Sequence, residues 1–180
     1  DLAIRVSNRK VLEEVLGALG IEGETFSKTC IIIDKMDKLP PEAIEQQLAD
    51  LGHGHDSIAR IRKVLGMKDL DDLSTELNSD SQAVKELQDL FALCESYGIT
   101  SWLSFDASVV RGLAYYTGSV FEAHDRDGEL RAICGGGRYD RLLSTLGGKD
   151  LPATGFGFGD MVIMELLSVK GLIPNLPSGN

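Results

Sequence analysis

An arginine and two adjacent tyrosines occupy one short stretch of the sequence, Arg111-Gly-Leu-Ala-Tyr115-Tyr116. An arginine that lines a cleft can hold a phosphate or a carboxylate through two parallel hydrogen bonds. It can also be a surface strand residue that pairs with a nearby acid. Neighbouring side chains of a regular strand point to opposite faces, so only one tyrosine can face a pocket unless a bulge intervenes. The stretch by itself leaves an anion site and a purely structural role open.

Three consecutive glycines, Gly135-Gly136-Gly137, stand directly before Arg138-Tyr139-Asp140. Glycine has no Cβ, so such a run lets two backbones, or a backbone and a ligand, approach closely. It can equally be a tight connection from a strand to a helix. We favour the connection, between a strand over residues 129–134 and a helix over residues 138–146.

A second glycine pattern, Gly155, Gly157 and Gly159, places glycine at every second residue. It fails the dinucleotide-binding pattern, which needs a glycine at the sixth position, where this chain has Asp160. In a strand the spacing instead clears one face of side chains. A flat ligand such as adenine could lie on that face, or another backbone could pack against it.

The histidines of the sequence do not indicate a metal site. His53 and His55 alternate in Gly-His-Gly-His-Asp, but no cysteine or acid stands at a matching ligand distance, so we expect a solvated loop and no bound metal. His124 is expected to be exposed at a hairpin turn. The sequence contains no GxSxG, P-loop or CxxC motif.

Composition narrows the class of protein. The chain has 180 residues and a net charge of −10. This negative charge argues against a protein that binds nucleic acid over most of its surface. Three widely spaced cysteines indicate a reducing compartment, and no apolar run approaches the roughly 20 residues that span a bilayer. The sequence begins at Asp1 without a methionine, so we expect an excised piece of a longer protein.

The first hundred residues predict a strand followed by helices. Leu2, Ile4 and Val6 alternate as in a strand. Asn8 or Ser7 can cap the helix that follows, from about residue 9 to residue 19. Further amphipathic helices are expected to begin at Pro41, at Asp56 or Ser57, and at Ser81. Because polar loops join them, we expect these helices to pack together as a small subdomain.

The remaining residues predict β-structure. Strands are expected over residues 103–105, 113–124 and 129–134, with the turn Asp125-Arg-Asp-Gly128 between the last two. The strand of alternating glycines at residues 155–159 leads into a helix from Asp160 to about Lys170. The fold class is therefore α+β, with an antiparallel core that the helical segment interrupts.

The order of three motifs adds a resemblance to a known family. Arg-Gly-Leu-Ala-Tyr-Tyr-Thr-Gly at 111–118, Gly-Gly-Arg-Tyr-Asp at 136–140 and Pro-Ala-Thr-Gly-Phe-Gly at 152–157 resemble the motifs of histidyl-tRNA synthetase, a class II aminoacyl-tRNA synthetase. The resemblance implies a catalytic-domain fragment, whose antiparallel sheet of class II type is flanked by helices. It divides the chain into core (1–24), helical insertion (25–100) and core continued with the third class motif (101–180).

The resemblance also implies roles for individual residues. Arg111 corresponds to the catalytic arginine, which contacts both histidine and ATP. The residues implied to bind histidine are Arg111, Tyr115, Tyr116 and Tyr139, and those implied to bind ATP are Arg111, Gly155, Gly157 and Gly159. The implied reaction activates L-histidine with ATP, accompanied by Mg²⁺, to histidyl-adenylate and transfers it to tRNA(His) for protein synthesis.

The parent enzyme is expected to be a homodimer without a membrane anchor, in the cytoplasm or, after loss of a transit peptide, in an organelle. The first and second class motifs and the anticodon-binding domain are not found in these 180 residues, so the fragment by itself is expected to be inactive.

Two departures from the family pattern leave an alternative open. Val162 stands where the family usually has an arginine that stacks on adenine, and Ala114 replaces an acid. Either another cation holds ATP, or the nucleotide binds poorly. The alternative function is a non-catalytic, synthetase-like regulatory domain that senses histidine or uncharged tRNA.

Overall fold

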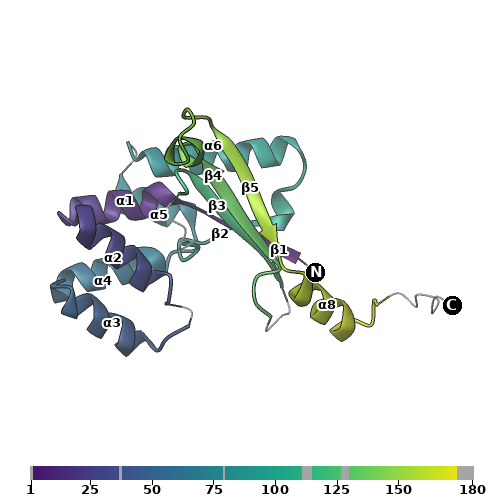
Figure 1. Ribbon diagram of the computed structural model, residues 1–180, viewed down its shortest axis with the longest axis horizontal. Coiled ribbons are helices and arrows are strands. Elements are labelled where there is room, and N and C mark those ends of the chain that lie inside the picture. Colours follow the sequence, from purple (N-terminus) through teal and green to yellow (C-terminus); the bar gives the residue numbers. More distant parts are fainter. Residues whose placement is uncertain (1, 37, 79, 111–114, 127–129, 174–180) are drawn as a thin grey trace.

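A five-stranded sheet organises the computed structural model, which describes residues 2–36, 38–78, 80–110, 115–126 and 130–173 (Figure 1). Its strand order is β2-β1-β3-β4-β5. The strands are β1 (Leu2–Asn8), β2 (Leu103–Phe105), β3 (Ser119–Asp125), β4 (Cys134–Tyr139) and β5 (Ala153–Phe158). The pair β1–β2 is parallel and the other three pairs are antiparallel. The predicted α+β class is confirmed, and the antiparallel core carries one parallel edge.

Eight α-helices and one short 3₁₀ helix, η1, surround the sheet in the described residues. They are α1 (Arg9–Ala18), α2 (Gly23–Ile33), α3 (Pro41–Asp50), α4 (His55–Leu65), α5 (Leu70–Leu77), α6 (Gln82–Ser96), η1 (Thr100–Trp102), α7 (Leu142–Thr145) and α8 (Asp160–Val169). No helix in this part of the chain combines the length and the apolar character needed to cross a bilayer.

Local signals explain where several helices begin. The Asn8 side chain accepts from Lys10 N (3.0 Å) and Ser81 Oγ accepts from Val84 N (3.1 Å), so each caps a helix as predicted. Pro41 begins α3, where its missing N–H costs no hydrogen bond. No sequence pattern predicted α2 or α5.

One hydrophobic core joins the sheet to the helical segment. Leu16 of α1, Ile61 of α4, Leu73 of α5 and Leu87 of α6 have no exposed surface and belong to one cluster, which also contains Val6 of β1. A smaller cluster joins α2, α3 and α4. Figure 1 shows α1–α5 gathered at one end of the sheet, whereas α8 leaves the opposite end of β5. The division at residues 24 and 100 stays a prediction.

The structure differs from the expected strands and helix of the C-terminal half at three places. Residues 115–118 form a turn and loop, and β3 begins only at Ser119. Residues 130–133 are not a strand, because β4 runs from Cys134 to Tyr139 and contains the glycine run. The predicted helix over residues 138–146 is reduced to α7, since its first two residues pair with β5.

The physical reason is the close approach of β4 and β5, which the sequence pattern did not reveal. A Cβ on Gly136 would lie 2.1 Å from the carbonyl oxygen of Gly155 and 2.6 Å from Phe156 Cβ. The glycines are therefore needed in the middle of the sheet, and they do not mark a strand-to-helix connection.

Candidate functional site

Three tyrosines that are distant in the sequence form one aromatic cluster. The ring centroids of Tyr115 and Tyr116 are 4.7 Å apart, and the ring of Tyr139 lies edge-on to Tyr115 at 5.7 Å. Val109 and Val120 complete the cluster, in which Tyr116 is buried and the other two tyrosines are half-buried. Because residues 115 and 116 are not in a strand, the rule of opposite faces does not apply and both rings can pack together.

Hydrogen bonds fix the loop that carries the first two tyrosines. Thr117 N donates to the carbonyl oxygen of Arg138 (2.9 Å), and Thr117 Oγ1 donates to Asp140 Oδ2 (3.0 Å) while accepting from Asp140 N (3.0 Å). Arg138 Nε donates to Asp140 Oδ1 at 2.9 Å, and this bond is the largest cause that lowers the pKa of Asp140. The ionised carboxylate of Asp140 therefore holds the loop of residues 115–118 against the end of β4.

Glycines make room for the rings on the sheet. A Cβ on Gly137 would lie 2.9 Å from Tyr116 Cδ1, and one on Gly155 would lie 2.6 Å from the Tyr139 hydroxyl oxygen. The two glycines are direct partners across β4 and β5, and the next pair on the same face is Gly135 with Gly157. A Cβ on Gly157 would meet nothing within 4 Å, so open space lies above the strand there.

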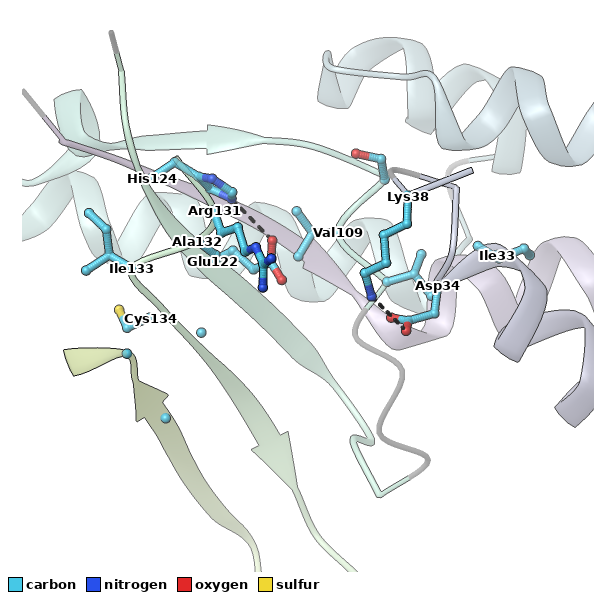
Figure 2. Close-up of a pocket in the computed structure, with 15 residues that line it drawn as sticks. Ile33, Asp34, Lys38, Val109, Glu122, His124, Arg131, Ala132, Ile133 and Cys134 are labelled. Atoms are coloured by element: carbon cyan, nitrogen blue, oxygen red, sulfur yellow. Dashed lines mark hydrogen bonds and ion pairs between the residues drawn. The ribbon is translucent and has the colours of Figure 1, made fainter. Parts of the chain in front are cut away.

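This open space belongs to a cavity of about 700 Å³, a size typical of small-molecule sites. Its glycine floor consists of Gly135, Gly157 and Gly159, and Val109 connects it to the tyrosine cluster. Its lining residues with acidic or basic side chains are Asp34, Lys38, Glu122, His124 and Arg131. Figure 2 shows the last three together over the sheet and the first two facing them from the helical segment.

The titratable residues of the cavity are partly paired. His124 Nε2 lies 3.2 Å from Glu122 Oε2, and Lys38 Nζ lies 3.8 Å from Asp34 Oδ2. His124 was expected to be exposed at a turn, and this is wrong. Its ring is largely covered, because β3 stays paired with β1 as far as Asp125.

The structure describes every predicted site residue except Arg111. Arg111 lies outside the described residues, although Val109 and Val110, just before it, line the cavity. Tyr115, Tyr116 and Tyr139 come together. Gly155 contacts this cluster, and Gly157 and Gly159 contribute to the cavity floor.

Five of the lining residues belong to no sequence motif. Glu122 and His124 alternate with Val120 in β3, so all three lie on one face, but no motif singles them out. Arg131 carries no local signal. Asp34 and Lys38 reach the cavity only because α2 ends beside the sheet, which no sequence pattern indicates.

His53 remains in a loop but is not fully solvated. Its Nε2 lies 2.7 Å from Thr29 Oγ1, whose own hydrogen is donated to the carbonyl oxygen of Thr25. The ring nitrogen is therefore the donor, and burial lowers the pKa of His53. Across the described ranges, no group of three histidine, cysteine or acidic side chains could hold a metal ion.

A buried carboxylate stands at the start of the segment that leads to Arg111. Asp106 forms an ion pair with Lys68, and its Oδ1 accepts from Ser108 N at 2.9 Å. Arg5 Nη1 lies 3.8 Å from its Oδ2. Burial would raise the pKa of Asp106, but the hydrogen bonds from Lys68 and Ser108 outweigh it and the pKa lies below its ordinary value.

We expect Asp106→Asn to lower the free energy of unfolding at pH 7 by about 2 kcal/mol, since charged hydrogen bonds are lost. A depressed pKa stabilises the folded state above the unfolded pKa of about 3.9. That contribution disappears as the pH falls through the folded value. Thermal melting of the two full-length proteins should therefore give different Tm values at pH 7, and the two values should converge as the pH falls below about 3.9.

The control is Asp80→Asn, because Asp80 is exposed and its ion pair with Lys85 is loose at 3.7 Å. It should leave Tm unchanged at both pH values. A pH-independent difference for Asp106→Asn would show that the charge of this residue is not what stabilises the fold.

Comparison with known proteins identifies one family over most of the chain. A family model described as histidyl-tRNA synthetase matches residues 1–160. A histidine–tRNA ligase of Arabidopsis thaliana, named chloroplastic/mitochondrial, is 54% identical over 98% of this chain and 36% of that protein. A histidine–tRNA ligase of Opitutus terrae is 38% identical over 97% of this chain and 41% of its own length.

Solved structures agree with the fold. The crystal structure of histidyl-tRNA synthetase from Nostoc superposes with a TM-score of 0.85 at 28% identity, over 98% of this chain and 44% of that one. A protein of Bacillus halodurans, described as an ATP phosphoribosyltransferase regulatory subunit/histidyl-tRNA synthetase, shares the fold at 22% identity with a TM-score of 0.73, over 92% of this chain and 44% of its own. The chain thus spans less than half the length of these relatives.

Proposed function

This chain belongs to the histidyl-tRNA synthetase family, and we propose that it forms part of the catalytic domain of a histidine–tRNA ligase within a longer parent protein. The observation that carries the proposal is the continuity between the tyrosine cluster and the glycine-floored cavity. Histidine occupies the aromatic end, where Tyr115, Tyr116 and Tyr139 meet. ATP lies along the bare face of β5, over Gly155, Gly157 and Gly159.

The geometry suits a reaction between two ligands that lie end to end. The carboxylate of histidine attacks the α-phosphate of ATP, which forms histidyl-adenylate and releases pyrophosphate. A hydroxyl at the 3′ end of tRNA(His) then attacks the carbonyl carbon, and AMP leaves. Negative charge gathers at the α-phosphate in the first step, and the guanidinium of Arg111 is the group that stabilises it. ATP enters with Mg²⁺, which neutralises part of its charge.

Exposed apolar side chains on β5 and α8 support further protein contacts in the parent. Phe156, Met161 and Val169 are 67%, 77% and 76% exposed. Such a concentration of apolar surface is typical of an interface. It supports coverage by the rest of a homodimeric parent enzyme. The Arabidopsis relative is named chloroplastic/mitochondrial, which supports an organelle, the alternative to the cytoplasm.

Histidine-dependent exchange of pyrophosphate into ATP by the full-length parent tests the function. Exchange that requires L-histidine, followed by charging of tRNA(His), is the expected result. Histidine binding without exchange would support the regulatory alternative, a sensor of histidine or uncharged tRNA. The names of the relatives at 54% and 38% identity favour the ligase.

The role of Tyr116 is tested by removal of its hydroxyl. We expect Tyr116→Phe to weaken histidine binding about tenfold, because a partner of the substrate's imidazole is lost in a buried site. Calorimetric titration of the full-length parent with L-histidine measures the change. Tyr97→Phe is the control, since Tyr97 is 78% exposed and lies at the end of α6, away from the cluster. Equal affinity of the Tyr116 variant and the unchanged protein would contradict this placement.

A further inference from the structure

One arginine that no motif contains lines two adjoining hollows of the molecule. Arg131 lies in the segment before β4 and contributes to the cavity above the glycine floor. It also lines a second hollow, of about 690 Å³, together with Leu130, Met161, Val162, Met164 and Glu165. The second group comes mainly from the first turns of α8. Arg131 therefore stands where the ATP cavity meets the beginning of that helix.

A backbone hydrogen bond holds this junction together. Gly159 N donates to the carbonyl oxygen of Ile133 at 2.8 Å, which brings the start of α8 beside the start of β4. A Cβ on Gly159 would lie 3.4 Å from that oxygen and 3.4 Å from Val162 Cγ2. The position of Arg131, two residues before Ile133, is thus fixed relative to the last glycine of the cavity floor.

The sequence places no other cation on the β5–α8 side of this junction. Residues 150–169 contain neither lysine nor arginine, and the first turn of α8 carries the acidic Asp160. Among the described residues Arg131 forms no hydrogen bond or ion pair, whereas Lys38 is close to Asp34 and His124 is close to Glu122. The guanidinium of Arg131 is therefore the charge at this end that is still available to an anionic ligand.

The direction of ATP along the floor follows from the tyrosine cluster. If histidine lies at that cluster, the α-phosphate must lie beside the histidine carboxylate, near Gly155 and Tyr139. Gly155, Gly157 and Gly159 alternate on one face, and each step along the strand adds about 7 Å between them. The part of ATP that extends from Gly155 toward Gly159 approaches Arg131. A guanidinium at that end matches the anionic terminal phosphates and not the uncharged adenosine, so the terminal phosphates point toward Arg131.

We propose that Arg131 binds the terminal phosphates of ATP in this cavity, an inference that rests on the function proposed above. A guanidinium presents a fork of N–H donors that matches two phosphate oxygens. Arg131 supplies a positive charge beside the start of α8, where Val162 is aliphatic. It acts as a ligand-binding residue for the polyphosphate and takes no part in binding histidine.

The test uses the full-length parent with Arg131→Met, which removes the charge and keeps an unbranched side chain. In histidine-dependent pyrophosphate exchange, the KM for ATP should rise about tenfold, whereas the KM for histidine should stay within about twofold. Arg131→Lys should recover part of the affinity for ATP, since lysine restores the positive charge but not the paired N–H donors of the guanidinium. Lys149→Gln, at an exposed lysine outside the cavity, is the control and should change neither constant.

A second measurement distinguishes binding of the terminal phosphates from binding of the rest of the nucleotide. Calorimetric binding of ATP should be weakened by Arg131→Met, whereas binding of AMP, which lacks the terminal phosphates, should not change. An unchanged KM for ATP, or an equal loss of affinity for AMP and ATP, would overturn the inference. If the unchanged parent shows no histidine-dependent exchange, the proposed function fails instead. The ATP titration then still decides whether Arg131 binds the polyphosphate.

Discussion

Replacement of Arg111 by alanine in the full-length parent should slow histidine activation by about 10²–10³-fold, the usual effect of removing one preorganised donor from a developing negative charge. The arginine is assigned to the α-phosphate and the histidine carboxylate, so the loss should fall mainly on kcat. The rate of histidine-dependent pyrophosphate exchange at saturating ATP and histidine measures it. The fold should be unaffected, which thermal melting checks.

The matched control for this prediction is Arg60→Ala. Arg60 lies on α4 and pairs with Glu76 at 3.4 Å, within the helical segment and outside the cavity lining. Its removal should leave the exchange rate unchanged. An Arg111→Ala enzyme with normal activation kinetics would remove the central claim about the reaction, and the regulatory function would then be the better explanation.

The second large effect is expected at the closest contact within the sheet. Gly136→Ala should destabilise the parent by about 3 kcal/mol, because the added methyl group would overlap the Gly155 carbonyl and Phe156 Cβ. Both are parts of β5 close to its backbone, so no flexible side-chain end can move aside. The strands must separate, and thermal melting should show a lower Tm for the domain.

Gly157→Ala is the matched control for stability. It lies on the neighbouring strand, and its added methyl group would meet nothing within 4 Å. We therefore expect a Tm equal to or slightly above that of the unchanged protein, since alanine also restricts the unfolded chain. Similar destabilisation by both substitutions would mean that the approach of β4 and β5 is not what requires glycine at position 136.

Local patterns were sufficient for the first strand, several helices and the fold class. Val6 and its alternating neighbours predicted β1, and Asn8, Pro41 and Ser81 marked helix starts that the structure confirms. These signals succeed because capping, helical periodicity and strand alternation depend on residues that are close in the sequence. The ordered motifs also predicted the family, to which the chain belongs.

Local patterns were insufficient where two segments that are distant in the sequence approach each other. Gly135-Gly136-Gly137 predicted a connection to a helix, but these glycines lie in β4 because β5 leaves no room for side chains there. Residues 115–118 have a β-prone sequence, yet they form a turn and loop that the bonds between Thr117, Arg138 and Asp140 hold. Neither outcome follows from propensity, because the deciding contacts join residues about twenty positions apart.

The sequence by itself determined the residue types for the chemistry: an arginine, a pair of tyrosines, a third tyrosine and a bare glycine strand. Only the tertiary structure decided that the three tyrosines share one cluster and that Glu122, His124 and Arg131 face the same cavity. It also brought Asp34 and Lys38 from the helical segment to that cavity. A sequence motif records the identity and spacing of residues along the chain. A binding site depends on which strands pair and in which register, and long-range packing sets both.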